Sequence, residues 1–298
     1  MKKAIVFGVN GYLGRHIAYF LSKYKIVFIP TDLAEKSIDN YSNYISIDIT
    51  NPDELLQLNY HVDGIFMFAG LTGSTNTPEM EKKYTKVNEQ GLVNVLNCCK
   101  GIKNLRLIFP STRLVYHGIK NTPLKENSEK ETKTIYAKNK LACEKILADY
   151  QLQHHLNYTI YRICVPYGNL INEEYSYGTI GFFINQAKNK NKITLYCDGS
   201  LKRTFTHVSD ICEVIIKSAE TEKTLNNTYN IGSYDVLSLL EVANLIAPKY
   251  GVGVEFIDWT KEALSVESGD TIFDDEKLQT TFNYQYQHSL KEWVKKML

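Results

Sequence analysis

The chain has 298 residues, of which 44% are hydrophobic, enough for one large α/β unit or two modest domains with a buried core. Its 34 Lys and Arg residues nearly balance 33 Asp and Glu residues. Proteins that bind nucleic acids or anionic membranes usually carry a basic excess, so this balance argues against such partners and favours a small-molecule ligand.

The N-terminus carries two lysines and a short apolar run, as a signal peptide does. Gly8 and Asn10 interrupt that run after five residues. No stretch of the sequence approaches the roughly 18 apolar residues of a membrane span. We therefore expect a cytoplasmic protein that does not interact with a membrane.

Short apolar runs alternate with helical patterns along the first half of the chain. The runs predict strands at residues 4–8, 25–29, 44–47, 64–70, 105–109 and 158–163. Apolar spacings of three and four residues predict helices at 12–24, 92–102 and 136–150. Buried strands separated by helices predict a Rossmann-type α/β fold, a doubly wound parallel sheet covered on both faces.

This strand-helix rhythm stops after about residue 168, and shorter, mixed elements follow. We therefore expect a cofactor-binding domain over residues 1–168, to which the chain returns at about 206–230. Residues 169–298 are predicted to form a smaller, mixed α/β lobe that binds the substrate.

Three glycines, Gly8, Gly11 and Gly14, lie between the first predicted strand and the first predicted helix. Glycines there permit a tight turn and a close approach to a pyrophosphate, which the helix N-terminus attracts. Asp32 ends the second strand, 24 residues after Gly8. An acid at that point can hold both adenosine ribose hydroxyls and repel a 2′-phosphate, so we predict NAD rather than NADP.

Asp48 and Ile49 follow the third predicted strand. They could bracket the adenine, through a hydrogen bond to its amino group and an apolar contact with its ring. The alternative is that this segment only begins a helix, for which Thr50 and Asn51 are both suitable N-caps.

Tyr136 and Lys140 have the spacing that places two side chains on one face of a helix. An ammonium beside a phenol stabilises the phenolate and lowers its pKa from about 10, which makes the tyrosine a general acid and base. The same spacing begins at Tyr19 and Tyr116, but the first lies within a helix and the second in a loop. Only Tyr136 lies at the start of a predicted helix that follows a strand ending in a hydroxyl-bearing residue, Thr112.

Six cysteines and seven histidines show no ligand spacing. We expect the cysteines to be buried reduced thiols and predict no metal site.

The chain resembles the extended short-chain dehydrogenase/reductases that act on nucleotide sugars. The resemblance covers almost the whole chain, in order, through GVNGYLG, Asp32, IDI, FAG, VNEQGLVNVL, PSTRLVYHG, YAKNK, RICVPYG, KRTFTHVSD and YNIGS. It implies an NAD-dependent enzyme whose substrate is a nucleotide-diphosphate sugar.

The resemblance also implies roles for particular residues. The catalytic set would be Thr112, Tyr136 and Lys140, and Lys140 would also hold the nicotinamide ribose. Asn88 would support the loop on the cofactor side, and Arg203 would reach the pyrophosphate of the substrate. The implied cofactor-binding residues are Gly8, Gly11, Tyr12, Leu13, Gly14, Asp32, Asp48, Ile49, Ala69, Gly70, Asn88, Tyr136 and Lys140. The implied substrate-binding residues are Thr72, Thr112, Arg113, Val165 and Arg203.

Arg113 and Leu114 distinguish the possible reactions. The 4,6-dehydratases of the family carry an Asp-Glu pair directly after the catalytic hydroxyl, and without those carboxyls dehydration has no obvious proton shuttle. A 4-epimerase acting through a 4-keto intermediate needs only Tyr, Thr, Lys and a nicotinamide, as does an NAD(P)H-dependent reductase of nucleotide-4-keto-6-deoxysugars. Asp32 favours retained NAD and so an epimerase, which the resemblance connects with surface polysaccharide precursors.

A third hypothesis is a catalytically silent nucleotide-binding protein on the same fold. The intact glycine loop and the intact Tyr136 and Lys140 pair argue against it. Members of the family often form homodimers through two helices, which here would be 81–101 and 136–150.

Two departures from the family concern the substrate. Epimerases usually have an asparagine where this chain has Val165. A second pyrophosphate arginine is expected shortly before the segment DDEKL, but the sequence there, ESGDTIFDD, contains none. Recognition by Arg203 alone would be weaker or differently arranged, which leaves the nucleotide open beyond the usual UDP.

Overall fold

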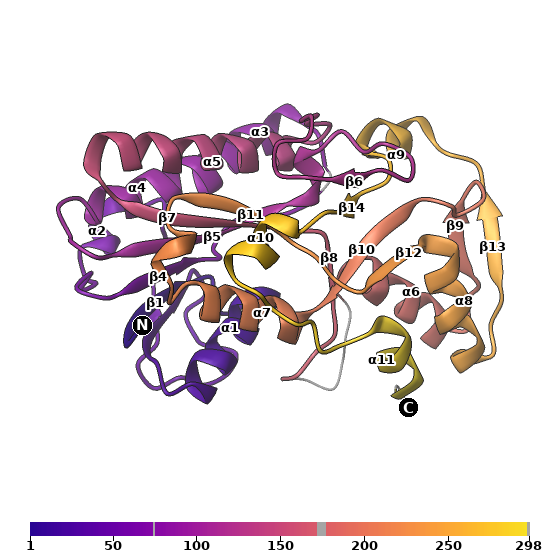
Figure 1. Cartoon of the computed structure of the whole chain (residues 1–298), viewed down its shortest axis with the longest axis horizontal. Coiled ribbons are helices and arrows are strands. Elements are labelled where there is room, and N and C mark those ends of the chain that lie inside the picture. Colours follow the sequence, from indigo (N-terminus) through magenta and orange to yellow (C-terminus); the bar gives the residue numbers. More distant parts are fainter. Residues whose placement is uncertain (74, 172–176, 297–298) are drawn as a thin grey trace. The chain divides into compact units, whose positions relative to one another are not determined.

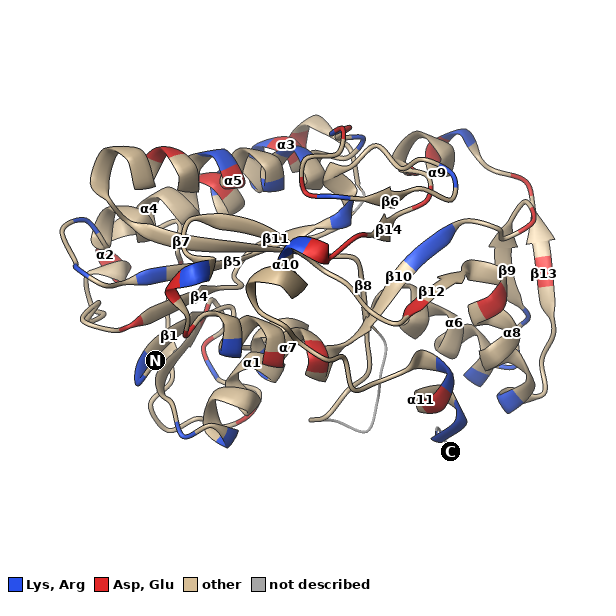
Figure 2. Ribbon diagram, viewed as in Figure 1, with Lys and Arg blue, Asp and Glu red and all other residues tan. Residues whose placement is uncertain are grey.

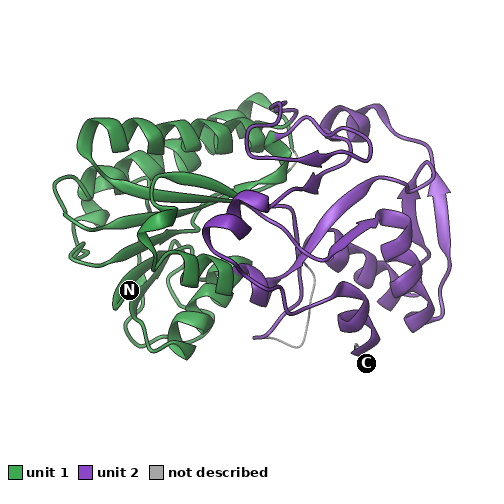
Figure 3. Cartoon of the chain, viewed as in Figure 1, with its two compact units in different colours: residues 1–115, 134–162, 212–229 green, residues 116–133, 163–211, 230–298 purple. Residues whose placement is uncertain are grey.

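The computed structural model describes residues 1–73, 75–171 and 177–296. The chain divides into two compact units, which we describe separately (Figure 3). Unit 1 comprises residues 1–115, 134–162 and 212–229. Unit 2 comprises residues 116–133, 163–211 and 230–298.

Unit 1 is built around a seven-stranded sheet of order β11-β7-β5-β4-β1-β2-β3. These strands are β1 (Lys3–Phe7), β2 (Val27–Asp32), β3 (Ile45–Ser46), β4 (Gly64–Met67), β5 (Arg106–Thr112), β7 (Asn157–Ile163) and β11 (Asn227–Ile231). β1 pairs in parallel with both β2 and β4, β2 with β3, and β4 with β5. The order reverses beside β1, which is the switch point of a doubly wound sheet.

Helices cover both faces of this sheet. They are α1 (Tyr12–Lys23), α2 (Pro52–Leu55), α3 (Pro78–Tyr84), α4 (Gly91–Cys98), α5 (Ile135–His154) and α7 (Val208–Ser218), with a π-helical segment, η1 (Thr85–Gln90), and 3-10 turns, η2 (Arg113–Val115) and η3 (Glu222–Thr224). Figure 1 shows α4 and α5 on one face and α1 and α7 on the other. The Rossmann-type fold predicted from the sequence is therefore confirmed.

The strands differ from their predicted bounds by one to three residues at their ends, and two of these differences have a structural meaning. The second strand begins at Val27 rather than at residue 25, because Lys25 takes a left-handed conformation with φ of 58°. The fifth does not end at residue 109 but continues through Ser111 to Thr112. The hydroxyl groups therefore belong to the strand itself and are held as rigidly as the sheet.

Unit 2 is a smaller assembly of short strands and helices. Its strands are β6 (Pro123–Leu124), β8 (Val165–Tyr167), β9 (Ile193–Tyr196), β10 (Lys202–His207), β12 (Asp235–Ser238), β13 (Val254–Ile257) and β14 (Ile272–Phe273). Its helices are α6 (Gly178–Lys188), α8 (Leu239–Tyr250), α9 (Lys261–Val266), α10 (Glu276–Thr281) and α11 (Leu290–Lys296). β10 pairs antiparallel with β12 and parallel with β8, so the unit is mixed.

The units do not follow the bounds predicted from the sequence. Residues 116–133 and 163–168 were expected in the first domain but belong to unit 2. Long-range contacts explain this difference: the Tyr116 hydroxyl donates to Asn230 at 2.6 Å, and Val165 pairs with Phe205. The chain returns to unit 1 over residues 212–229, within the predicted range of about 206–230.

Charges of both signs are interspersed over the chain, for example along α3 and α5 (Figure 2). Among the described residues, no helix is long and apolar enough to cross a membrane. A group of three or more His, Cys, Asp or Glu residues suited to a metal ion is also absent from that part of the chain.

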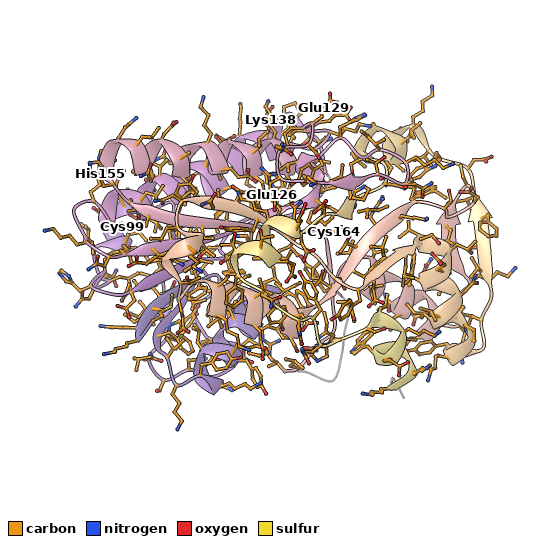
Figure 4. The ribbon with its side chains drawn as sticks, viewed as in Figure 1. Cys99, Glu126, Glu129, Lys138, His155 and Cys164 are labelled. Atoms are coloured by element: carbon orange, nitrogen blue, oxygen red, sulfur yellow. The ribbon has the colours of Figure 1, made fainter. Side chains whose placement is uncertain are left out.

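The cysteines follow the expectation of burial only in part. Cys99, Cys143, Cys164 and Cys212 are buried, and the Cys164 thiol donates to the carbonyl of Thr271 at 3.2 Å (Figure 4). Cys98 is half-buried, and Cys197 is exposed, in a turn where its φ is 48°.

Asp210 fixes the C-terminal segment of unit 2. Its carboxylate, 1% exposed, accepts hydrogen bonds from the Tyr284 hydroxyl at 2.9 Å and from the amides of Gln287 and His288 at 3.0 and 3.1 Å. Burial by itself raises the pKa of Asp210, but hydrogen bonds from His288, Gln287 and Tyr284 hold it below the ordinary value of 3.8.

We expect Asp210→Ala to lower the free energy of unfolding by about 2–4 kcal/mol at neutral pH, because several donors lose a buried charged acceptor. The folded-state pKa is depressed, so this contribution is complete above pH 3.8 and is lost as the pH falls through the folded value. Urea unfolding followed by circular dichroism measures the effect, with the exposed Asp258→Ala as control. Equal stability of Asp210→Ala and wild type at pH 7 would contradict the assignment.

Candidate active site

The turn between β1 and α1 is closely packed and depends on its glycines. Gly8 has φ of +83°, and a Cβ there would lie 2.4 Å from the backbone nitrogen of Ala69. A Cβ on Gly14 would lie 2.0 Å from the carbonyl oxygen of Gly8. Gly11 is the N-cap of α1 and has no side chain, so the first amides of the helix are left for water or for an anionic ligand.

Asp32 lies at the end of β2 and is tied to this turn. Its two carboxylate oxygens accept hydrogen bonds from the amides of Asn10 at 2.9 Å and Leu33 at 2.8 Å. The Asn10 side chain in turn accepts from Ile38 and donates to the carbonyl of Lys36. The glycine turn, Asp32 and the loop after β2 therefore form one hydrogen-bonded arrangement.

Arg15 and Asp39 extend this arrangement, and the sequence reasoning missed both. Two nitrogens of the Arg15 guanidinium donate to the Asp39 carboxylate, at 2.8 and 2.5 Å. The pair joins α1 to the loop after β2. The only sequence signal was an arginine one residue after the third glycine.

Asp48 and Ile49 lie beyond β3. The Asp48 carboxylate accepts from the amide of Thr50 at 2.8 Å, while Asn51 is the N-cap of α2. Ile49 is 6% exposed and packs against α4, where a Cβ on Gly91 would meet its terminal carbon at 2.6 Å. Of the two sequence alternatives, the structure therefore shows the cap at Asn51, and the adenine contact stays a prediction.

Asn88 supports the loop after β4. Its side-chain oxygen accepts from the amide of Leu71 at 2.7 Å, and its side-chain nitrogen donates to the carbonyl of the same residue. Gly70 in this loop has φ of +154°, and a Cβ there would approach the Asn88 oxygen. Asn88 lies in the π-helical segment, a deformation often found at functional sites.

Tyr136 and Lys140 lie in the first two turns of α5, which begins after the N-cap Thr134. The Lys140 ammonium donates to the carbonyl of Pro110 at 2.7 Å and lies 5.8 Å from the centre of the Tyr136 ring. Pro110 is two residues before Thr112 on β5. One buried ammonium therefore lies near the Tyr136 ring and against the backbone of the strand that ends at Thr112.

Burial lowers the pKa of Lys140 to about 8, against the opposing influence of Cys143 and Glu144. Lys138, between the two catalytic candidates, instead pairs with Glu81 of α3 at the surface (Figure 4).

The two hydroxyls at the end of β5 have different partners. Thr112 is 8% exposed, and its hydroxyl accepts from the amide of Leu114 at 3.3 Å. The Ser111 hydroxyl donates to the Glu144 carboxylate, which is paired with Arg162 of β7. Ser111 is therefore committed to a buried network.

The remaining candidates are distributed over both units. In unit 1, Thr72 is exposed in the loop after β4, and Arg113 is half-buried in the 3-10 turn after β5. In unit 2, Val165 is 5% exposed in β8, and Arg203 is 2% exposed in β10. Arg203 is already paired, with Glu267.

A glycine turn, an acid at the end of β2 and a Tyr-Lys pair near the end of β5 are features typical of dinucleotide-dependent enzymes. Comparison with known proteins agrees. The family model described as the NAD dependent epimerase/dehydratase family matches residues 4–232, and the chain belongs to this family.

Relatives within the family include enzymes of nucleotide sugars. The chain is 30% identical to a UDP-N-acetyl-alpha-D-glucosaminuronate decarboxylase of Bacillus cytotoxicus, over 81% of this chain and 78% of the relative. It is 26% identical to an uncharacterized UDP-glucose epimerase, YtcB, of Bacillus subtilis, over 97% and 95% of the two chains. The structure of Thermus thermophilus UDP-glucose 4-epimerase with NAD superposes with a TM-score of 0.84 at 20% identity, over 99% of this chain and 98% of that one.

NAD is the cofactor of this family, and the residues present fit it. The first amides of α1 have no side-chain cap, as a pyrophosphate site requires, and Asp32 holds its acceptor oxygens beside the same turn. When bound, NAD supplies a hydride acceptor and donor.

We expect Asp32→Ala to weaken NAD binding by about tenfold or more, because the ribose hydroxyls lose an acceptor. The ratio of NAD affinity to NADP affinity should also fall, because a 2′-phosphate no longer meets a carboxylate. Titration of nucleotide-free protein with both dinucleotides measures this, with Asp53→Ala, an exposed acid on α2, as control. A wild-type preference for NADP would contradict this role of Asp32.

The depressed pKa of Lys140 predicts the pH dependence of turnover. The ammonium loses its proton as the pH rises through about 8, and the rate should fall with it, because the neutral amine no longer stabilises a phenolate. In Lys140→Arg, which stays charged, this alkaline fall should disappear even if the rate is lower; Lys138→Arg should retain it. An alkaline limb near pH 8 that persists in Lys140→Arg would show that another group titrates.

Proposed function

We propose that the protein is an NAD-dependent nucleotide-sugar 4-epimerase that acts through a 4-keto intermediate. The observation that carries this proposal is the buried Lys140 ammonium, which lies near the Tyr136 ring and against the backbone of the strand that ends at Thr112. This arrangement suits hydride chemistry at one carbinol carbon. The similarity to nucleotide-sugar enzymes supports the substrate class.

Tyr136 is the proposed general base and acid. As a phenolate it takes the proton from the C4 hydroxyl while the hydride leaves that carbon, and it returns the proton when the hydride re-enters the other face. Lys140 and the positive end of α5 both stabilise the phenolate. Thr112 donates a hydrogen bond to the same sugar oxygen, and its place in β5 keeps it fixed.

Arg113 and Leu114 support epimerisation over 4,6-dehydration. They follow Thr112 directly, in the turn η2. Elimination of water across C5 and C6 needs a proton donor and acceptor there, which neither side chain supplies at neutral pH.

A second candidate is oxidative decarboxylation, which the 30% identical relative favours. The first step would be the same, because Tyr136 would again take the C4 hydroxyl proton. If C6 is a carboxylate, the 4-ketone makes the sugar a β-keto acid, which can lose CO₂. Decarboxylation therefore requires a C6 carboxylate on the substrate, and release of CO₂ rather than inversion at C4 distinguishes it from epimerisation.

The test is turnover without added cofactor by the protein as purified. We expect stereochemical inversion at C4 of a nucleotide sugar, about one NAD released per denatured chain, and a loss of about 10²–10⁴-fold in Tyr136→Phe with its NAD retained. Product identity is measured by NMR of the nucleotide-sugar pool. Tyr19→Phe is the matched control, because Tyr19 has the same spacing to a lysine but is 43% exposed.

Release of CO₂ from 6-carboxy sugars, without inversion, would replace the epimerase by the decarboxylase. An empty cofactor site together with NADH consumption on a 4-keto sugar would indicate a reductase. Full activity in Tyr136→Phe would contradict the epimerase, the decarboxylase and the reductase alike, because each of the three reactions uses Tyr136 as its acid or base.

A further inference from the structure

Arg203 of unit 2 is buried and bound by other residues of the same unit. The residue is 2% exposed; one guanidinium nitrogen donates to the Glu267 carboxylate at 2.6 Å, and another donates to the carbonyls of Lys202 and Gly269. Glu267 keeps 18% side-chain exposure and is the more accessible partner.

The carboxylate of Glu267 is held in this place by the loop around it. The oxygen that binds Arg203 also accepts from the amide of Gly269 at 3.0 Å. Gly269 has φ of +79°, and a Cβ there would lie 2.4 Å from the carbonyl oxygen of Gly118. The loop is fixed further because the Gly118 amide donates to Ser268 at 2.8 Å and the Lys133 ammonium donates to the Glu267 carbonyl.

The loop borders a cleft at Gly269, although neither Arg203 nor Glu267 lines that cleft. Gly269 lines a cleft of about 380 Å³ together with Lys120, Lys202 and Asp270. That volume lies within the range of small-molecule sites. Glu267 itself begins the segment ESGDTIFDD, in which a second arginine was expected and none is present.

We propose that Glu267 is an internal counter-ion that competes with the substrate diphosphate for Arg203 and so sets the affinity for the nucleotide half of the substrate. This inference rests on the proposed function, in which Arg203 contacts the diphosphate. When a diphosphate binds Arg203, the Glu267 carboxylate must either move away from the guanidinium or share it with the diphosphate. Either event has a free-energy cost, since like charges held close in a buried site repel strongly.

The consequence is weaker binding of the nucleotide-sugar product through its diphosphate. A diphosphate bound by an uncompensated arginine would dissociate slowly, whereas one that competes with Glu267 is released more readily. Glu267 is thus a specificity-determining residue that shifts recognition away from the diphosphate.

The test is calorimetric titration of the NAD-loaded protein with UDP, dTDP, GDP and CDP. Glu267→Gln should bind the preferred nucleoside diphosphate at least about tenfold more tightly than wild type, because it keeps the shape of the side chain and removes the charge. The gain should disappear in the double variant Glu267→Gln with Arg203→Gln. Glu276→Gln, which removes an exposed acid paired with Lys125 in the same unit, is the matched control and should leave the affinity unchanged.

Glu267→Asp, whose shorter arm draws back from Arg203, should show a smaller gain and provides a second variant if Glu267→Gln does not fold. Retained NAD and an unchanged melting temperature establish folding. Measurable nucleoside diphosphate binding with no gain, or a loss, in the Glu267 variants would overturn this inference alone. Absence of nucleoside diphosphate binding in every variant, with NAD retained, would overturn both this inference and the proposed nucleotide-sugar function.

Discussion

The arrangement of unit 1 depends on one buried ion pair, between Glu144 of α5 and Arg162 of β7. Two guanidinium nitrogens bind the carboxylate, which also accepts from Ser111 of β5. Loss of one partner of such a pair typically costs about 3–5 kcal/mol, because the other charge stays buried. The pair therefore fixes α5 against β5 and β7. Glu144 lies one helical turn after Lys140, and its partner Ser111 directly precedes Thr112. The contact thus holds together the two elements, α5 and β5, that carry the three proposed catalytic residues.

Local patterns in the sequence were sufficient for the fold class and for the glycine turn between β1 and α1. The alternation of apolar runs and helices predicted the doubly wound sheet, and the glycine spacing with Asp32 predicted the turn that the structure shows. Tyr136 and Lys140 were identified because their spacing coincides with a helix start. These features depend on residues close in sequence, where periodicity and backbone chemistry carry the information.

What the sequence did not show depends on contacts between distant residues. Nothing near Glu144 indicates a partner 18 positions later, and nothing in residues 116–133 indicates that they join unit 2 through Asn230. The engagement of Arg203 by Glu267, 64 positions away, was equally hidden. An arginine in a familiar motif predicts a cation at that point of the chain, but its effective charge depends on what the fold places beside it.

The contact of Gly8 with Ala69 has a consequence for how the cofactor turn can evolve. A side chain at Gly8 would overlap the backbone beyond β4, and one at Gly14 would overlap Gly8 itself. Gly8 is thus packed closely against two stretches of backbone, the residues after β4 and the first turn of α1. No single substitution that adds volume at either glycine can be accommodated by rotating a neighbouring side chain. A larger residue at Gly8 or Gly14 would therefore require the main chain of both segments to move together. Substitutions that alter the preference for one dinucleotide over another are thus expected at positions such as Asp32, which is not part of this backbone contact.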